Sequence, residues 1–169
     1  MDASTDWGIG GAGTHYFLLK HEDLIPIFQM YQKCPHKKAF DLPPIAYIEL
    51  IAALVGFSVF SELYQNTLVR LNTDNSDVVS WLKRGRCSRG LGFKILATIE
   101  YFKRKNGLKI STFHILGRHN NTADMLSRGK IPRWLINQGK RLEIDITKLH
   151  SIISNPLFFW KENLMQSFV

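Results

Sequence analysis

Four acidic residues occupy positions from which their carboxylates could bind a divalent metal ion together: Asp2, Glu49, Asp74 and Asp124. Hard cations such as Mg²⁺ prefer carboxylate oxygens, and the cysteines and histidines show no zinc-like spacing. We expect two of these acids at the ends of strands and two in the first or second turn of helices. If those elements meet at one edge of a sheet, the four side chains converge on a single metal site.

Each acid also has an ordinary structural explanation. An acid in the first turn of a helix, as predicted for Asp124, suits the helix dipole, with residue 121 or 122 as the cap. Asp74 begins a polar stretch that caps a helix, with Ser76 as the expected capping side chain. Glu49 lies on an apolar helix, where it can point outward to water; a buried carboxylate there is costly unless a cation or hydrogen bond compensates it.

The first elements that must position these acids follow from the apolar pattern and the turn residues. We expect a strand that ends at 2–4 and a second strand of a hairpin over 7–19. The glycines of this second strand permit close backbone approach, and their spacing does not match a phosphate-binding loop. A third strand is predicted over 24–30, with Pro26 placing it near a sheet edge.

A central helix and a buried strand are predicted next. Residues 45–63 are apolar on nearly every side, which is typical of a helix packed against a sheet, and Pro43 and Pro44 suit its start. Residues 67–73 predict a short buried strand of the parallel type. Asp74 follows at its carboxyl end, where ligands collect in α/β sheets.

The stretch from His114 to Arg128 reads His-Ile-Leu-Gly-Arg-His-Asn-Asn-Thr-Ala-Asp-Met-Leu-Ser-Arg. It resembles the closing motif of ribonuclease H domains in retroelement reverse transcriptases, of the LTR or tyrosine-recombinase type. Asp2-Ala-Ser is similar to the family's opening motif, and Glu49 in Ile-Glu-Leu-Ile-Ala-Ala-Leu to its helix glutamate. Thr73-Asp74-Asn75 resembles its second strand motif. The four motifs occur in the family's order, so the resemblance covers roughly residues 2 to 128.

This resemblance implies an α/β ribonuclease H-like fold with a mixed central sheet and helices on both faces. It would occupy residues 1–128, with most of the first strand truncated, and would leave 129–169 as an extension of unclear role. An adjacent reverse-transcriptase domain in a longer polyprotein is then an expected partner.

The implied reaction is metal-dependent hydrolysis of the RNA strand of an RNA–DNA hybrid, with two Mg²⁺ ions, or Mn²⁺ in their place. Asp2 would bridge both ions, Glu49 and Asp74 would bind one, and Asp124 the other. His119 stands where many members carry a histidine that assists proton transfer or product release. An ordinary surface histidine is the alternative for His119.

Positive charge favours a polyanionic partner without identifying it. The formal net charge is +8, from 22 Lys and Arg against 14 Asp and Glu. A basic run follows the Asp74 strand, and we expect it to contact the nucleic-acid backbone, although charge runs are commonly just solvated faces. The predicted nucleic-acid contacts are Asn75, Lys83, Arg84, Arg86, Arg89, Lys94 and Arg118.

Other features narrow the class of protein. Cys34 and Cys87 do not form a disulfide framework, which suits a reducing compartment. No secretory signal is visible, and the apolar stretch 45–60 is shorter than the ~20 residues of a membrane span. We therefore expect an intracellular protein without a membrane partner, cytoplasmic or nuclear.

Two alternatives stay open. The chain could be a catalytically inactive remnant of the same fold that binds nucleic acid or a partner protein, which the short first strand favours. It could also be another nuclease or transferase of the superfold, such as an integrase core. The Ala-Asp-Met-Leu-Ser-Arg motif argues against the second alternative.

Overall fold

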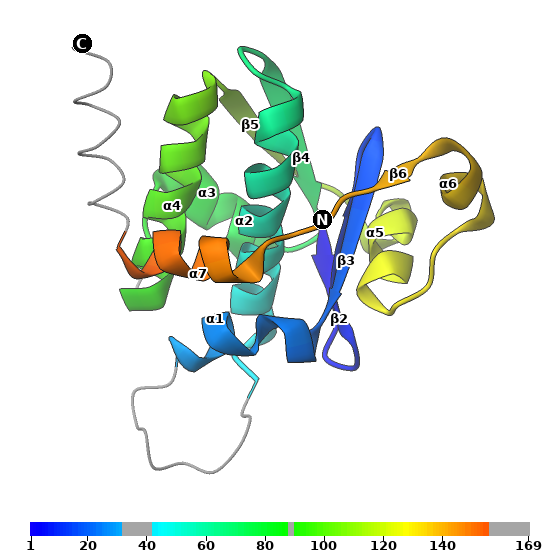
Figure 1. Cartoon of the computed structure of the whole chain (residues 1–169), viewed down its shortest axis with the longest axis horizontal. Coiled ribbons are helices and arrows are strands. Elements are labelled where there is room, and N and C mark those ends of the chain that lie inside the picture. The colour runs from blue at the N-terminus through cyan, green and yellow to red at the C-terminus, as the bar shows by residue number, and fades with distance from the viewer. Residues whose placement is uncertain (32–41, 88–89, 156–169) are drawn as a thin grey trace.

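The computed structural model describes residues 1–31, 42–87 and 90–155, and it has an α/β fold with a mixed sheet (Figure 1). One sheet has the strand order β1-β2-β3-β6, in which β1, β2 and β3 pair antiparallel and β6 pairs parallel with β3. A second sheet consists of β4 and β5, which pair in parallel. The strand bounds are β1 Asp2–Ala3, β2 Gly8–Ala12, β3 His15–Lys20, β4 Leu68–Thr73, β5 Lys109–His114 and β6 Lys140–Arg141.

Helices lie on both sides of the strands. In Figure 1, α2 and α4 lie to one side of β2 and β3, and α5 and α6 to the other. The α-helices are α1 Ile25–Gln29, α2 Ile45–Leu63, α3 Ser76–Arg84, α4 Gly90–Asn106, α5 Asn121–Ser127, α6 Arg133–Gln138 and α7 Ile146–Ser154. Two 3₁₀ turns, η1 His21–Leu24 and η2 Gly117–His119, precede α1 and α5.

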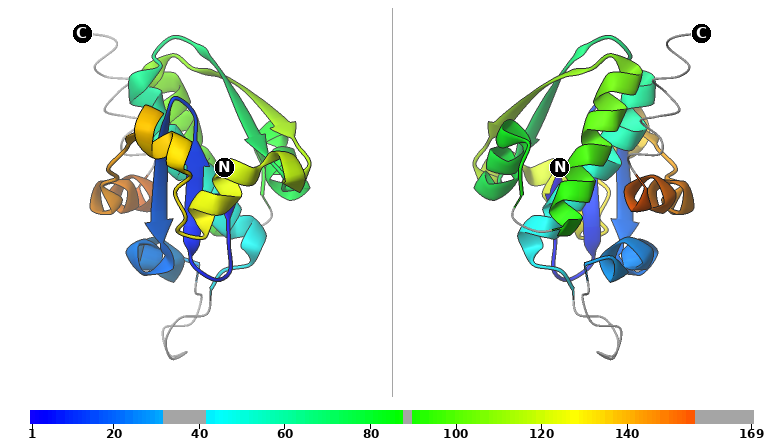
Figure 2. Two further views of the ribbon diagram at one scale, coloured as in Figure 1. Left: turned by 90° about the vertical axis from the view of Figure 1, so that its right-hand side faces the viewer. Right: turned by 90° about the vertical axis from the view of Figure 1, so that its left-hand side faces the viewer.

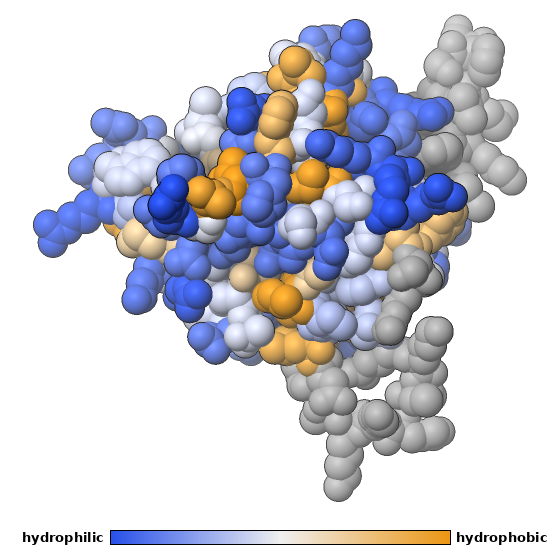
Figure 3. Space-filling view, turned by 180° about the vertical axis from the view of Figure 1, so that it is seen from behind, coloured by the Kyte–Doolittle hydropathy of each residue, from blue (hydrophilic) through white to orange (hydrophobic). Residues whose placement is uncertain are grey.

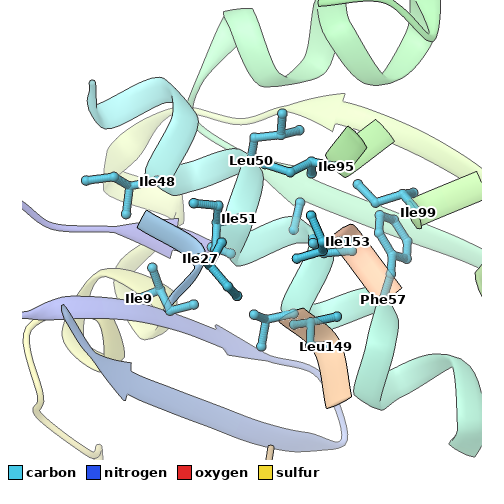
Figure 4. Close-up of a cluster of buried hydrophobic side chains, with 14 of the residues drawn as sticks. Ile9, Ile27, Ile48, Leu50, Ile51, Phe57, Ile95, Ile99, Leu149 and Ile153 are labelled. Carbon is cyan, nitrogen blue, oxygen red and sulfur yellow. The ribbon is translucent and has the colours of Figure 1, made fainter. Parts of the chain in front are cut away.

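The core is built around α2, as its apolar sequence predicts. Ile48, Leu50 and Ile51 of this helix are fully buried, and they meet side chains from the first sheet, α1, α4 and α7 (Figure 4). Among the described helices, α2 is long and apolar enough to cross a membrane by length and composition. Most of it is buried inside the fold, and that burial accounts for its composition.

Glycines in β2 let other parts of the chain approach both of its faces closely. A side chain at Gly10 would collide with Leu126 of α5, and one at Gly11 would collide with Phe17 of β3 and with Met1. Successive residues of a strand point to opposite faces, so α5 packs on one face and the main core on the other. The close approach predicted for these glycines is confirmed.

Two predicted strands of the N-terminal region are wrong. Residues 7–19 form two strands rather than one, because the chain turns at Gly13 and Thr14 between β2 and β3. Residues 24–30 form helix α1 rather than an edge strand. Pro26 stands in the first turn of that helix, where a missing N–H costs nothing.

The C-terminal extension belongs to the same fold as far as residue 155. β6 adds to the edge of β3, and Leu149, Ile152 and Ile153 of α7 join the main core. Helix α7 begins at Ile146, where the Asp145 side chain accepts a hydrogen bond from the Lys148 amide at 3.0 Å. The apolar stretch 156–160 lies outside the described residues.

The strands form two sheets rather than the single predicted sheet. β1 has only two residues, so it pairs with β2 but leaves most of β4 unpaired on that side within the described chain. Figure 2 shows the N-terminus between the blue strands and the green pair β4–β5. Near this point the Met1 amino group donates a hydrogen bond to the Asn72 carbonyl at 3.1 Å.

The surface is mixed in character. The face shown in Figure 3 is largely hydrophilic, with separate small apolar patches between charged and polar side chains. Isolated exposed apolar residues of this kind are ordinary on folded proteins and indicate no particular partner.

Candidate metal centre

Three of the four predicted acids converge beside the Met1 amino group. Asp2 in β1, Glu49 in the second turn of α2 and Asp74 directly after β4 each place a carboxylate oxygen within 4.8 Å of the other two. Three elements distant in sequence therefore meet, and three hard oxygen ligands lie close enough to share one divalent ion.

Asp2 is buried, with 5% of its surface exposed. Burial raises the pKa of its carboxyl to about 6, while a hydrogen bond from the Ser127 side chain opposes that change and the nearby Asp74 and Asp124 add to it. The Ser127 hydroxyl lies 2.7 Å from Asp2 Oδ2. It is also 2.9 Å from the Asp124 carbonyl, and its single proton serves one acceptor at a time.

Glu49, like Asp2, is a buried acid with a raised pKa. It is 8% exposed, and burial raises its pKa to about 7, with Asp2 adding to the shift and a hydrogen bond from the Asn75 side chain opposing it. Its buried Oε2 atom has no hydrogen-bond partner within the described chain. A buried carboxylate oxygen without a partner is costly, and a bound cation would compensate it.

Asn75 connects the cluster to α3. Its side-chain oxygen accepts hydrogen bonds from the amides of Asp77 at 2.9 Å and Val78 at 3.2 Å, which leaves its NH₂ group to donate to Glu49. The helix cap is therefore Asn75 and not Ser76 as predicted. The contact of Asn75 with nucleic acid stays a prediction, and within the chain its side chain contacts Glu49 and the start of α3.

Asp74 is the most accessible of the three clustered acids, and its surroundings hold it in place. The His114 Nε2 atom is 3.1 Å from the Asp74 backbone carbonyl. The side-chain amide of Asn120 donates to the Met1 carbonyl at 3.1 Å and lies 3.5 Å from Asp74 Oδ1. The contact of His114 with the backbone of Asp74 is a structural one, because it holds the strand end and not the carboxylate.

Asp124 does not join the cluster, contrary to the predicted convergence of all four acids. Its carboxylate accepts a hydrogen bond from Arg128 Nε at 2.9 Å, one turn along α5, and the same guanidinium lies 3.8 Å from Asp6. Four-residue spacing on a helix brings such pairs together. Asp124 still acts on the cluster, because its charge contributes to the raised pKa of Asp2.

The start of α5 also differs from prediction. The residue at its cap position is Asn120, not 121 or 122, and no side chain caps the helix. The Asn120 carbonyl instead accepts the Asp124 amide at 3.0 Å.

Apart from Asn75, the predicted nucleic-acid contacts within the described residues are exposed. Lys83 and Arg84 lie in the last turn of α3, and Arg86 follows the helix. Arg84 is nine residues, or about 14 Å of helix rise, from Asn75. Lys94 is exposed in the second turn of α4, and Arg118 is exposed in η2. Arg89 lies outside the described residues.

His119 ends the 3₁₀ turn before α5 and is exposed. It lines a cleft together with Asn120 and Met1 rather than lying in the acid cluster itself. The geometry leaves both predicted roles for it open.

Sequence analysis did not identify the residues that hold the acids in place. Ser127, Asn120 and the Met1 amino group all contact the cluster or its backbone. Ser127 and Asn120 lie within the 114–128 stretch that resembles the closing motif. That motif is the sequence feature from which their role near the site could have been predicted. Burial lowers the pKa of the Met1 amino group, and the three acids oppose that shift.

The donor set fits a hard divalent cation. The three carboxylates, the partnerless Glu49 oxygen and the raised pKa values of Asp2 and Glu49 describe a site whose negative charge is under-compensated. The oxygens do not by themselves select Mg²⁺ over other hard cations. Comparison of the chain with protein-family models, with curated proteins and with solved structures found no match.

Proposed function

We propose that the chain is a metal-dependent endonuclease of the ribonuclease H type, of retroelement origin, that hydrolyses the RNA strand of RNA–DNA hybrids. The observation that carries the proposal is the convergence of Asp2, Glu49 and Asp74 with a buried Glu49 oxygen that lacks a partner. The order of the four motifs and the helices on both faces of the strands also support it.

The residues of the site have distinct tasks in this proposal. Asp2, Glu49 and Asp74 hold the metal, and Ser127 and Asn75 orient the first two of these carboxylates through hydrogen bonds. A bound Mg²⁺ or Mn²⁺ would supply Lewis-acid activation of the attacking water and stabilise charge on the scissile phosphate. Asp124 lies beside the cluster and would contribute after it leaves Arg128. His119, exposed at the adjacent turn, can exchange a proton with solvent.

The proposed substrate agrees with the charge of the chain. Lys83, Arg84, Arg86 and Lys94 are exposed at one end of the α3–α4 region and would contact phosphates beyond the reacting strand. Recognition of the RNA strand would require contacts to its 2′-hydroxyl groups. An adjacent reverse-transcriptase domain in a longer polyprotein would deliver the hybrid.

A cleavage assay on an RNA–DNA hybrid labelled in its RNA strand tests the proposal. The chain should cut that strand with Mg²⁺ or Mn²⁺ and stop when the metal is chelated. Asp74→Asn should abolish cleavage, because it removes a ligand charge with little change in volume. Glu143→Gln, which neutralises an exposed acid outside the cluster, is the matched control and should cut normally.

Two other results would redirect the proposal. Hybrid binding without cleavage by a folded, metal-loaded chain would favour the inactive nucleic-acid-binding remnant. Cleavage that is unchanged in Asp74→Asn would show that the acid cluster is not the active site.

A further inference from the structure

The stretch of chain that follows the first turns of α5 carries unbalanced positive charge. Between Asp124 and Glu143 the sequence has no acidic residue and five basic ones: Arg128, Lys130, Arg133, Lys140 and Arg141. All five are exposed. Arg128 lies beside Asp124 and Asp6, whereas the other four form no ion pair within the part of the chain that the structure describes. Their charge is therefore free to attract an anionic ligand.

Packing holds this stretch against one face of the first sheet. Leu135 of α6 packs with Tyr16 and Leu18 of β3 in a small hydrophobic cluster. In Figure 1, α5 and α6 lie on the opposite side of β2 and β3 from α3 and α4, which carry the other basic run. The two positively charged regions are therefore separate surfaces.

The register of β6 shows which of its two side chains belongs to this surface. β6 pairs in parallel with β3, with Lys140 opposite His15 and Arg141 opposite Tyr16. Paired residues of neighbouring strands point to the same face of a sheet, and successive residues alternate. Arg141 therefore points, like Tyr16, to the side of α5 and α6, and Lys140 points to the other face.

Helix α6 adds an aromatic side chain to these charges. Leu135 is its buried residue. At about 100° per residue, Arg133 and Asn137 then point outward. Trp134 lies on one flank of the helix and Ile136 on the other.

Trp134 and its cationic neighbours define the class of ligand. Trp134 is 52% exposed, although tryptophan is highly buried on average. Cations that hold phosphates, beside an aromatic ring on which a base can stack, are what single-stranded nucleic acid requires. A duplex hides the faces of its bases, so a stacked ring needs an unpaired strand. A helix that binds a membrane surface needs one continuous apolar face, whereas α6 directs Arg133 and Asn137 outward.

We propose that this side of the first sheet binds single-stranded nucleic acid, with the cations on its phosphates and Trp134 on a base. The residues of this single-strand surface are Lys130, Arg133, Trp134 and Arg141. DNA and RNA share the chemistry that it recognises, so a single strand of either kind is a ligand. The inference goes beyond the proposed hydrolysis, because this binding needs neither metal nor the acid cluster.

Fluorescence anisotropy with the whole chain and a metal chelator tests the role of Trp134. The probes are labelled oligomers of thymidine and of uridine, each about twelve nucleotides long. Both should bind, and Trp134→Leu should weaken the binding of both by about tenfold, because leucine keeps apolar area but offers no face for a base. Ile136→Ala, on the other flank, is the matched control and should bind like the wild type.

A blunt RNA–DNA hybrid is the second probe for the same variants. It offers no unpaired base to Trp134, so Trp134→Leu should bind it like the wild type. Unchanged single-strand binding by Trp134→Leu, or equal weakening for the single strand and the hybrid, would overturn the proposal.

The salt dependence of binding tests the cations. Replacing Lys130, Arg133 and Arg141 together by Ala should reduce the salt slope for the thymidine oligomer by about two, since each phosphate contact of a single strand contributes about 0.7. Lys140→Ala removes one exposed charge from the opposite face of β6 and should leave the slope unchanged. An equal slope in the triple variant and the wild type would overturn the proposal. All three replaced side chains are exposed, so this variant decides the question if Trp134→Leu does not fold.

Two further results separate this proposal from others. Vesicles of phosphatidylserine should bind the wild type and Trp134→Leu equally; vesicle binding that requires Trp134 would assign the surface to a membrane and overturn the proposal. A chain that binds the oligomers through Trp134 but cuts no hybrid would support the single-strand surface and contradict the proposed hydrolysis. The two proposals therefore fail separately.

Discussion

Two acidic regions flank the end of β1, and their negative charge is compensated in different ways. Asp2 and Glu49 are buried, and their pKa values are raised to about 6 and 7. Asp124 belongs to α5, which packs on the opposite face of β2 from the main core. It is half-exposed and pairs with Arg128. Among the described residues no side chain forms an ion pair with Asp2 or Glu49, and the Met1 amino group only partly offsets their charge, whereas Asp124 is paired with Arg128. The difference indicates that a bound metal ion would mainly compensate the charge of the buried acids. Asp124 would have to lose its ion pair with Arg128 before it could bind the metal.

The largest expected effect comes from Glu49→Gln. At pH 8, above the pKa of about 7, wild-type Glu49 carries a buried charge, and the neutral amide removes its cost. Without metal, the variant should be more stable by on the order of 2 kcal/mol, which is a rise in Tm of roughly 4–8 °C. With Mg²⁺ the wild type should gain stability and the variant should gain much less.

Thermal unfolding of the wild type and of Glu49→Gln, each with chelator and with Mg²⁺, measures both the difference in stability and its change when metal is added. Glu143→Gln is the control, since Glu143 is exposed and outside the cluster. A variant less stable than the wild type under chelator would mean that Glu49 is compensated within the fold and needs no cation.

The second prediction concerns the pH dependence of stability without metal. Asp2 and Glu49 have pKa values raised from 3.8 to about 6 and from 4.5 to about 7. Between about pH 4 and 7 the native state therefore binds more protons than the unfolded state. The free energy of unfolding should fall as pH rises through this window. Urea unfolding between pH 4.5 and 7.5 measures it.

Added Mg²⁺ should oppose this pH trend. The metal binds the deprotonated carboxylates, so its affinity and its stabilising effect should both increase toward pH 7.5. The Asp2→Asn, Glu49→Gln double variant should lose most of the slope. A slope that persists in the double variant would assign the titration to other groups.

These residues also show what the sequence could and could not predict. The positions of Asp2, Glu49 and Asp74 follow from local patterns: a strand end, a helix turn and a parallel strand. Their convergence required the order of the motifs as well, since local pattern does not specify which elements meet. Helix α2 was predictable because its apolar residues cover every side.

The errors have local physical causes. The pair between Asp124 and Arg128 was overlooked although four-residue spacing on a helix favours it. Residues 25–29 form a helix rather than the predicted edge strand, because Pro26 suits the first turn of a helix as well as the edge of a sheet. The division into two sheets accompanies a β1 of only two residues, Asp2–Ala3, which pairs with β2.

A smaller effect is expected from the basic residues, which lie far from both acidic regions. Replacing Arg84 and Arg86 by Ala should weaken binding to an RNA–DNA hybrid and reduce the salt dependence of binding by about one unit of slope per lost phosphate contact. Metal-dependent stabilisation should not change, because α3 separates these side chains from the cluster. Fluorescence anisotropy between 50 and 200 mM salt, roughly the range over which such contacts are screened, gives the slope. An unchanged slope would mean that Arg84 and Arg86 do not contact phosphates and only form a solvated face.

The smallest predicted effect tests whether Asp124 belongs to the metal site at all. Arg128→Ala removes the side chain that holds the Asp124 carboxylate at 2.9 Å and leaves the three clustered acids untouched. Because the pair is exposed, the stability of the fold should change little. Asp124 no longer has to leave a cation, so Mg²⁺ affinity should rise by about twofold. Arg133→Ala, at an exposed position in α6, is the matched control for the loss of one positive charge.

Isothermal titration with Mg²⁺ on the wild type, both single variants and Arg128→Ala combined with Asp124→Asn separates the possibilities. If Asp124 contributes to the site, the gain in Arg128→Ala disappears when Asp124 is also replaced. If the gain persists in the double variant, it comes from the general loss of positive charge, and Arg133→Ala should show it too. In that case the metal site consists of Asp2, Glu49 and Asp74 alone, and the comparison between the two acidic regions becomes one between a metal site and a structural ion pair.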